Sequence, residues 1–231
     1  HYQLGYVFYK RNEYEAAIAE FNKIIAGENS VAQNAYYHLA QCYLKTEKKS
    51  EALNAFKNAF EMDFDVSIKE DAFLNYAKLS YEIGNPYQSV PELLTSYLKK
   101  HPNSSEKETI EVLLIDSYIT SKNYTEALTL LENKSGFDYK VAYQKVAFYR
   151  AVELFNGGQY SLASSLFEKV IKEPRTPKFT ARAHYWKAEC EYVLNNFDDA
   201  IIGYKQFAQQ DSLMMFSEAK NLEYQLGYSY F

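Results

Sequence analysis

Four histidines and two cysteines are the residues best suited to bind a metal or to act as a base or a nucleophile. The histidines are His1, His38, His101 and His184, and the cysteines are Cys42 and Cys190. None of them belongs to a His-Glu-x-x-His pair, a cysteine–histidine ligand cluster or a nucleophile motif. We therefore expect no catalytic residue, no metal and no cofactor, and the chain is predicted not to be an enzyme. The two cysteines are expected to be small packing residues.

Aromatic side chains are the other residues capable of recognition. The chain has 23 tyrosines and 15 phenylalanines, more hydroxylated rings than a helical core needs. A tyrosine ring buries a large apolar area, loses few rotamers and keeps a hydroxyl group for hydrogen bonds. Which rings reach a surface depends on the elements that carry them.

A short turn followed by a helix recurs along the whole chain. In the copy Asn195–Tyr204, a small residue, Ala200, lies between the aromatic residues Phe197 and Tyr204. The small position recurs at intervals of 35, 38, 37, 36 and 37 residues, as Ala17, Ala52, Val90, Ala127, Ala163 and Ala200. A fixed period of this length indicates a tandem repeat, each unit being a helix pair that the next unit covers.

Apolar periodicity predicts two helices in each unit. The expected helices are 1–10, 14–26, 30–45, 49–62, 66–83, 86–100, 104–120, 124–133, 138–156, 160–173, 177–194, 198–210 and 213–231. Reciprocal caps are predicted for the pairs Asn12/Glu15, Ser30/Gln33 and Asn123/Glu126. Asn85-Pro86 and Thr176-Pro177 are predicted to begin helices.

The pattern resembles the tetratricopeptide repeat family over essentially the whole chain. Matching residues are Leu4, Gly5, Phe8, Tyr14, Ala17 and Phe21 in the first repeat, and Leu114, Tyr118, Tyr124, Ala127 and Leu131 in the fourth. The resemblance implies an all-α, right-handed superhelical solenoid of antiparallel helix pairs, with about six repeats and a partial seventh. Residues 1–231 are expected to form one solenoid, and a chain that starts and stops inside a helix is expected to be part of a longer array.

In this family the first helix of each pair lines a concave groove. The residues that face the groove lie three positions before, one after and four after the small residue of that helix. The resemblance therefore implies partner-binding residues on those helices, with Lys145 and Arg182 as the nearest basic candidates. The aromatic anchors expected are Tyr6, Tyr9, Tyr37, Phe148, Tyr185 and Tyr192. The carboxylate-binding set of some family members is missing. The alternative is that these rings pack against neighbouring first helices.

Three positions depart from the repeat pattern. In the third repeat Lys78 stands at the small position, and Ala77 would serve if the turn at Gly84-Asn85-Pro86 had one extra residue. In the fifth and sixth repeats, Arg150 and Lys187 replace an expected leucine. Glu191 replaces an aromatic residue and could pair with Lys187. Either local exposure or a polar site explains these charges.

Charge and hydropathy restrict the partners. The net charge is −5 with acids and bases interspersed, so nucleic acid is not an expected partner. No apolar run reaches the roughly 18 residues needed to span a membrane. A protein or peptide partner is expected. Self-association is a further possibility, through the apolar residues of the two ends, which are Leu4, Phe8, Leu226, Tyr230 and Phe231.

The leading hypothesis is a non-catalytic scaffold that binds a helix or an extended peptide in an aromatic-lined concave groove. The alternative is an accessory arm of a larger enzyme or of an envelope assembly machine. The richness in tyrosine, lysine and asparagine is similar to that of bacterial cell-envelope repeat proteins, which favours a periplasmic or envelope location over the cytoplasm.

Overall fold

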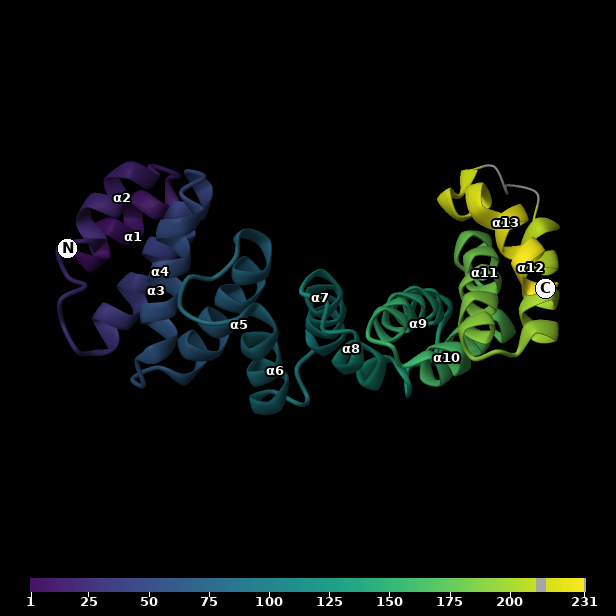
Figure 1. The fold of residues 1–231 in the computed structure, drawn as a ribbon. Helices are drawn as coiled ribbons and strands as arrows, with labels where there is room; N and C mark the ends of the chain where they lie inside the picture. Colours follow the sequence, from purple (N-terminus) through teal and green to yellow (C-terminus); the bar gives the residue numbers. More distant parts are fainter. Residues whose placement is uncertain (211–214, 231) are drawn as a thin grey trace. The chain divides into compact units, whose positions relative to one another are not determined.

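A computed structural model describes residues 1–210 and 215–230 (Figure 1). The described part of the chain contains helices and no strand, and consecutive helices pack against each other within residues 2–100 and within residues 124–229. The predicted all-α class of stacked helix pairs is confirmed. The chain divides into two compact units, His1–Ser117 and Tyr118–Phe231, and each is described by itself. A single continuous solenoid over residues 1–231 stays a prediction.

Unit 1 is built from α1 to α6 and most of α7. These helices are α1 Tyr2–Lys10, α2 Tyr14–Phe21, α3 Ser30–Lys45, α4 Lys49–Glu61, α5 Val66–Ile83, α6 Val90–Lys100 and α7 Lys107–Thr120. Within this unit the first helices of successive pairs, α1, α3 and α5, contact one another.

Unit 2 contains the remaining helices. They are α8 Tyr124–Leu131, α9 Phe137–Asn156, α10 Tyr160–Lys172, α11 Pro177–Val193, α12 Phe197–Ala208, the 3-10 helix η2 Ser217–Asn221 and α13 Leu222–Ser229. Part of the predicted helix 213–231 lies outside the described residues, as do Phe231 and residues 211–214.

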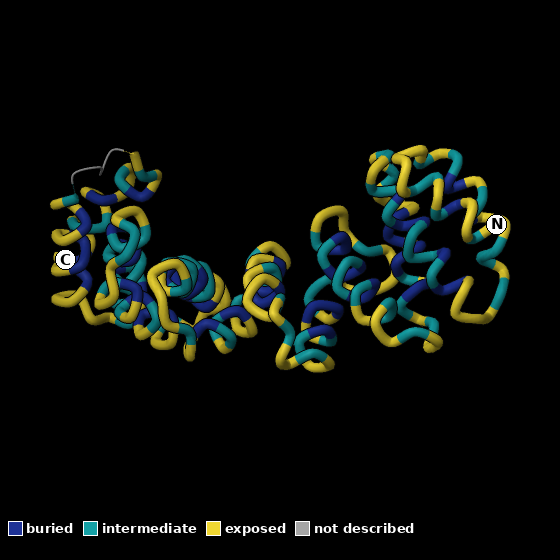
Figure 2. The backbone as a smooth tube through the Cα atoms, turned by 180° about the vertical axis from the view of Figure 1, so that it is seen from behind, coloured by how far each residue is buried: buried dark blue, intermediate teal, exposed yellow. Residues whose placement is uncertain are grey.

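Five of the six small residues of the repeat lie in the core, and the sixth, Val90, is half-buried. Ala17, Ala52, Ala127, Ala163 and Ala200 are all fully enclosed, and Figure 2 shows buried and exposed stretches alternating along the helices. The close approach of the helices is visible at two glycines. A Cβ on Gly5 would lie 2.9 Å from the ring of Phe21, and one on Gly203 would lie 2.9 Å from the Cβ of Ala188.

The turn inside each pair has one recurring geometry. A residue with positive φ lies five positions before the small residue; these residues are Asn12 (φ 62°), Glu47 (60°), Lys122 (61°), Gly158 (74°) and Asn195 (64°). The amide of the following residue donates to a carbonyl five positions back, for example Lys48 N to Tyr43 O at 2.8 Å. This hydrogen bond closes the last turn of the first helix.

The third repeat has one extra residue in this turn, as the sequence suggested. Its positive-φ residue is Gly84 (φ 82°), six positions before Val90. Accordingly Ala77 is fully enclosed. Lys78 reaches outward, and its Nζ lies 2.7 Å from Oε2 of Glu106.

The predicted reciprocal caps are wrong. Asn12 lies in the left-handed turn, Asn123 makes no side-chain cap, and Asn29, not Ser30, caps α3 by accepting from Ala32 N. Helix α6 begins at Val90 after Ser89, not at residue 86, whereas α11 begins at Pro177 as predicted. A cap and a turn both favour asparagine, so composition alone did not separate them.

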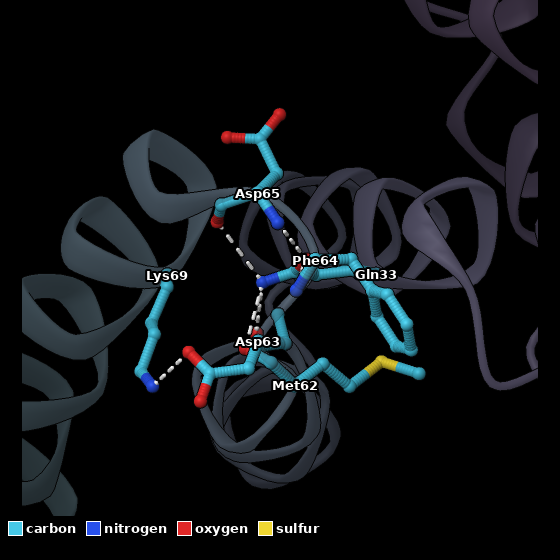
Figure 3. Close-up of polar contacts among 7 residues, drawn as sticks. Gln33, Met62, Asp63, Phe64, Asp65 and Lys69 are labelled. Carbon is cyan, nitrogen blue, oxygen red and sulfur yellow. Dashed lines mark hydrogen bonds and ion pairs between the residues drawn. The ribbon is translucent and has the colours of Figure 1, made fainter.

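The glutamine expected in a cap instead joins three helices. Gln33, on α3, is fully enclosed. Its Nε2 donates to the carbonyl oxygens of Ala59 (3.0 Å), Met62 (3.0 Å) and Asp65 (3.2 Å), at the end of α4 and the start of α5. Its Oε1 accepts from the amides of Phe64 (3.2 Å) and Asp65 (2.7 Å) (Figure 3). One side chain thus satisfies backbone groups that two helix ends leave unpaired.

The same connection recurs in unit 2. Gln144, on α9, donates to the carbonyl oxygen of Val170 (3.2 Å) and to Oγ1 of Thr180 (2.9 Å), and it accepts from the amide of Thr176 (2.7 Å). We call these two residues the latch glutamines. Each latch glutamine holds the second helix of one pair to the first helix of the next pair. This connection fixes the orientation of the first helices, which carry the candidate site.

Replacing Gln33 with alanine should lower the free energy of unfolding by at least about 2 kcal/mol, because several buried backbone groups lose their partner. Urea unfolding followed by circular dichroism measures this loss. Gln41→Ala, on the same helix but half-buried, is the control and should cost much less. Equal costs for the two substitutions would contradict the role of the latch.

Glycine at a left-handed turn position should stabilise the protein. Lys122→Gly relieves the steric cost of a side chain at positive φ and should raise the free energy of unfolding by up to about 1 kcal/mol. Lys122→Val should lower it, because a β-branched side chain fits this conformation worst. Thermal melts of the two variants and the parent protein test the order, and a Lys122→Val variant as stable as Lys122→Gly would contradict it.

Candidate functional site

The predicted partner-binding residues fall into two groups. Tyr6, Tyr9 and Tyr37 lie on α1 and α3 in unit 1. The others lie on α9 and α11 in unit 2; these are Lys145, Phe148, Arg182, Tyr185 and Tyr192. The structure therefore brings together three of the expected anchors in unit 1, and a separate set in unit 2.

In unit 1 four tyrosines gather around one histidine. The ring centroid of His38 lies 5.2 Å from that of Tyr6, 5.3 Å from Tyr9, 5.5 Å from Tyr37 and 6.1 Å from Tyr2. All five side chains are half-buried, so part of each remains accessible. We call Tyr2, Tyr6, Tyr9, Tyr37 and His38 the aromatic face.

Charged groups border the aromatic face on both sides. The Lys10 ammonium lies 5.2 Å from the Tyr6 ring centroid and 6.0 Å from that of Tyr9, within reach of cation–π attraction. On the other side the Tyr37 hydroxyl donates to the Asp71 carboxylate of α5. Burial, together with Asp71, raises the pKa of Tyr37. The rings are thus held in place by contacts from three helices.

His38 occupies the centre of the face as a neutral imidazole. Burial, with a smaller contribution from Lys10, lowers its pKa to about 4. Its Nδ1 is enclosed without a hydrogen-bond partner among the described residues. The sequence placed His38 among packing or groove-lining residues, but it did not show that His38 organises the other rings. The aromatic residues Tyr149 and Trp186 occupy the same position, two before the small residue, in later repeats, and this recurrence was the missed signal.

Two predicted anchors of unit 2 lie in the core. Phe148 is fully enclosed and Tyr185 is 5% exposed. Phe148 packs against Phe167 and Phe179, and Tyr185 packs against Phe207. A ring enclosed in this way offers no surface to a partner, so these two residues are corrected from contact residues to core residues. Phe148 contacts a neighbouring first helix through Phe179 of α11, as in the alternative, whereas Tyr185 packs on α12, the second helix of its own pair.

The basic candidate Arg182 is engaged inside the unit. Its Nε donates to the Glu218 carboxylate at 2.7 Å, and its guanidinium lies 4.9 Å from the Phe148 ring centroid. Trp186 Nε1 donates to the same Glu218 oxygen at 3.0 Å. Burial alone would raise the pKa of Glu218, but these hydrogen bonds and its backbone partner lower it overall. Arg182 therefore secures η2, and of the unit 2 candidates Lys145 and Tyr192 keep accessible surface.

Asp71 and Arg182 contact two matching rings in different ways. Tyr37 and Asp71 are separated by the same 34 positions as Phe148 and Arg182. In unit 1 the tyrosine turns its hydroxyl to the carboxylate, whereas in unit 2 the guanidinium covers the phenylalanine ring. The side chain on the next first helix thus contacts a hydroxyl group in one unit and a ring face in the other.

The charges that departed from the repeat pattern form separate contacts. Lys187 Nζ pairs with Glu168 at 2.7 Å, so the predicted pair with Glu191 is wrong. Glu191 instead accepts from Ser164 Oγ and from Asn196 Nδ2. Arg150 pairs with Glu153 of its own helix. These are local contacts of half-exposed side chains.

The two cysteines take no part in the aromatic face or in the candidate contacts of unit 2. Cys42 and Cys190 are free and fully enclosed, and burial raises the pKa of each thiol to about 12. Both are packing residues, as predicted. Among the described residues, no group of three or more histidine, cysteine, aspartate or glutamate side chains is placed to hold a metal. In that same part of the chain, no helix has the length and hydropathy of a membrane span.

The apolar end residues differ in exposure. Leu4 is 47% exposed and Tyr230 is 62% exposed, whereas Phe8 and Leu226 are half-buried. Phe231 lies outside the described residues. Self-association through these ends stays a prediction.

Unit 1 should lose stability as the pH falls, because of His38. Its folded-state pKa of about 4 is below the ordinary 6.5, so the unfolded chain takes up the proton first and the folded form is penalised from about pH 6.5 down to about 4. His38→Leu should reduce this loss by on the order of 1 kcal/mol between about pH 7 and 5. Urea unfolding at several pH values measures it. Identical pH dependence in the parent and the variant would contradict a neutral, buried His38.

Two family models match parts of the chain. Residues 1–59 match the family described as anaphase-promoting complex, cyclosome, subunit 3, and residues 150–212 match the tetratricopeptide repeat. A comparison with curated proteins finds no match.

Several solved structures are similar to the chain. A tetratricopeptide repeat protein from Parabacteroides merdae is 13% identical, with a TM-score of 0.42, over 100% of this chain and 83% of that one. A complex of the TPR2AB domain of yeast Sti1 with pHSP90 is 15% identical, with a TM-score of 0.37, over 99% and 96%. The C-terminal part of a repeat protein from Cytophaga hutchinsonii is 16% identical, with a TM-score of 0.38, over 96% and 99%.

The family assignment rests on the repeat itself. One turn geometry and one enclosed small residue recur pair after pair, and a repeat model matches residues 150–212. The two matches and the recurring helix pair support a protein of the tetratricopeptide repeat family.

Proposed function

We propose that the chain is a non-catalytic protein-binding scaffold and that the aromatic face of unit 1 receives a helix or an extended segment of a partner. The observation that carries this proposal is the gathering of Tyr6, Tyr9 and Tyr37 around His38 on two adjacent first helices. A family built from such repeats is suited to binding proteins through its helix faces.

The physical properties of the face support this proposal. Its rings are half-buried and held by one another, so they lose little rotamer freedom when a partner covers them. Each remaining ring surface is apolar, and each hydroxyl can still exchange hydrogen bonds. Large, rigid and amphipathic side chains of this kind are the usual anchors of protein interfaces. In unit 2 the accessible residues Tyr192 and Lys145 remain proposed contacts, whereas Phe148, Tyr185 and Arg182 are not part of the proposed surface.

A second candidate is an accessory arm within a larger assembly. It is favoured by the match of residues 1–59 to a family described as a subunit of the anaphase-promoting complex. The two candidates agree that a protein partner is bound, and they differ in whether that partner is part of a permanent assembly.

Truncating the aromatic face should weaken binding while leaving the rest of unit 1 able to fold. Peptides selected from a displayed random library on the whole chain would be measured by calorimetry against Tyr6→Ala and Tyr9→Ala variants. We expect each substitution to cost about 2 kcal/mol, or roughly a thirtyfold rise in Kd. Thermal melts would confirm that the variants are folded.

The control for this experiment is Tyr87→Ala. Tyr87 is 54% exposed, and its hydroxyl donates to Asn54 on α4, a second helix of its pair. The control should leave the affinity unchanged. Selected peptides that bind the Tyr6→Ala and Tyr9→Ala variants as tightly as the parent protein would overturn the proposal.

A further inference from the structure

A cleft in unit 2 is lined by lysines, away from the residues proposed above. It has a volume of about 370 Å³ and lies between the end of α8, the first half of α9 and the end of α10. Leu131, Tyr139 and Tyr143 contribute apolar and aromatic side chains to its lining. Four lysines line it as well; they are Lys134, Lys140, Lys169 and Lys172.

The charges of the cleft do not cancel. Two carboxylates line it, those of Glu132 and Glu173. Glu173 lies 3.8 Å from Lys140 Nζ and 3.7 Å from a guanidinium nitrogen of Arg175. Among the described residues, Lys169 makes no ion pair, and Lys172 reaches Glu168 at 3.1 Å with most of its side chain exposed. The cleft is therefore locally positive in a chain whose net charge is −5.

The repeat fold does not require these lysines. Unit 1 has a matching cleft. Positions in the two units correspond when they differ by 111 residues, as Gln33 and Gln144 do, and both clefts are lined by residues at the end of the second helix of a pair. There Asn58 and Glu61 stand where unit 2 has Lys169 and Lys172, and Glu28 and Asp63 add further negative charge. The same architecture thus carries acids in one unit and bases in the other, so the helix pairing itself does not require lysines at these positions.

We propose that the lysine-lined cleft of unit 2 binds an acidic peptide segment of a partner protein. Ammonium groups on flexible stems bind carboxylates as point charges and adapt to irregular spacing. The rings of Tyr139 and Tyr143 and the Leu131 side chain cover the methylene groups of bound glutamate or aspartate residues. A short acidic segment suits a confined cleft better than a long polyanion, which the negative remainder of the chain repels.

The test uses the whole chain and a fluorescein-labelled oligoglutamate peptide, with binding followed by fluorescence anisotropy. The variant is Lys169→Gln with Lys172→Gln, two lysines of the last turn of α10. We expect its Kd to rise by about tenfold, and the binding of the parent protein to weaken as salt screens the charges. The matched control is Lys99→Gln with Lys100→Gln, which removes two lysines from the last turn of α6 and should leave the affinity unchanged.

Two further probes distinguish the classes of ligand. A labelled single-stranded oligonucleotide and inorganic tripolyphosphate would be titrated against the same proteins. Weaker binding of both than of the peptide supports the proposal. The proposal would be overturned if the oligonucleotide or tripolyphosphate bound the parent protein more tightly than the peptide does and also lost affinity in the Lys169→Gln, Lys172→Gln variant. Equal affinity of the peptide for the parent, the variant and the control, or no binding to any of them, would also overturn it.

Discussion

The structure depends on the close approach of two helix backbones at one small residue per helix. Ala151 and Ala163 are both fully enclosed and belong to the same core cluster, as do Ala188 and Ala200 in the next pair. At Gly203 the approach is so close that an added Cβ would collide with Ala188. Because this contact cannot shift along either helix without steric overlap, it sets the register of these pairs.

The other features of the repeat follow from that register. The turn between the two helices has only a few residues, and it reaches the required geometry through one residue at positive φ. Four of the five turns that share one length use a residue other than glycine there, which shows that the packing of the pair outweighs the local steric cost. In each unit one latch glutamine then connects a helix pair to the next first helix, so that local pairing is extended beyond the pair.

The candidate sites arise from what neighbouring helices add to a common framework. Tyr37 and Phe148 hold the same position relative to their small residues, yet Asp71 accepts a hydrogen bond from the first and Arg182 lies over the ring of the second. The two matching clefts likewise share a framework but carry opposite charge. A repeat protein therefore differentiates its surfaces by changing side chains whose partners lie about one repeat away in the sequence.

Much of the fold could be predicted because its determinants are local. The period, the paired helices, the small positions and the extra residue in the third turn all appear within about 40 residues of sequence, where spacing predicts contact. The helix caps could not be predicted, because asparagine suits both a cap and a left-handed turn. Gln33 was assigned to a cap by its spacing from Ser30, although its partners lie 26 to 32 positions away.

The sequence by itself determined the family, the helix pairs and the register of the small residues, since each depends on spacing within one unit. Only the tertiary structure decided which rings are accessible, that His38 lies at the centre of four tyrosines, and that four lysines of a mixed-charge sequence line one cleft. The physical reason is that burial and electrostatic potential depend on side chains brought together from different helices. Their contacts are fixed by how helices stack, and no spacing within a single repeat records them.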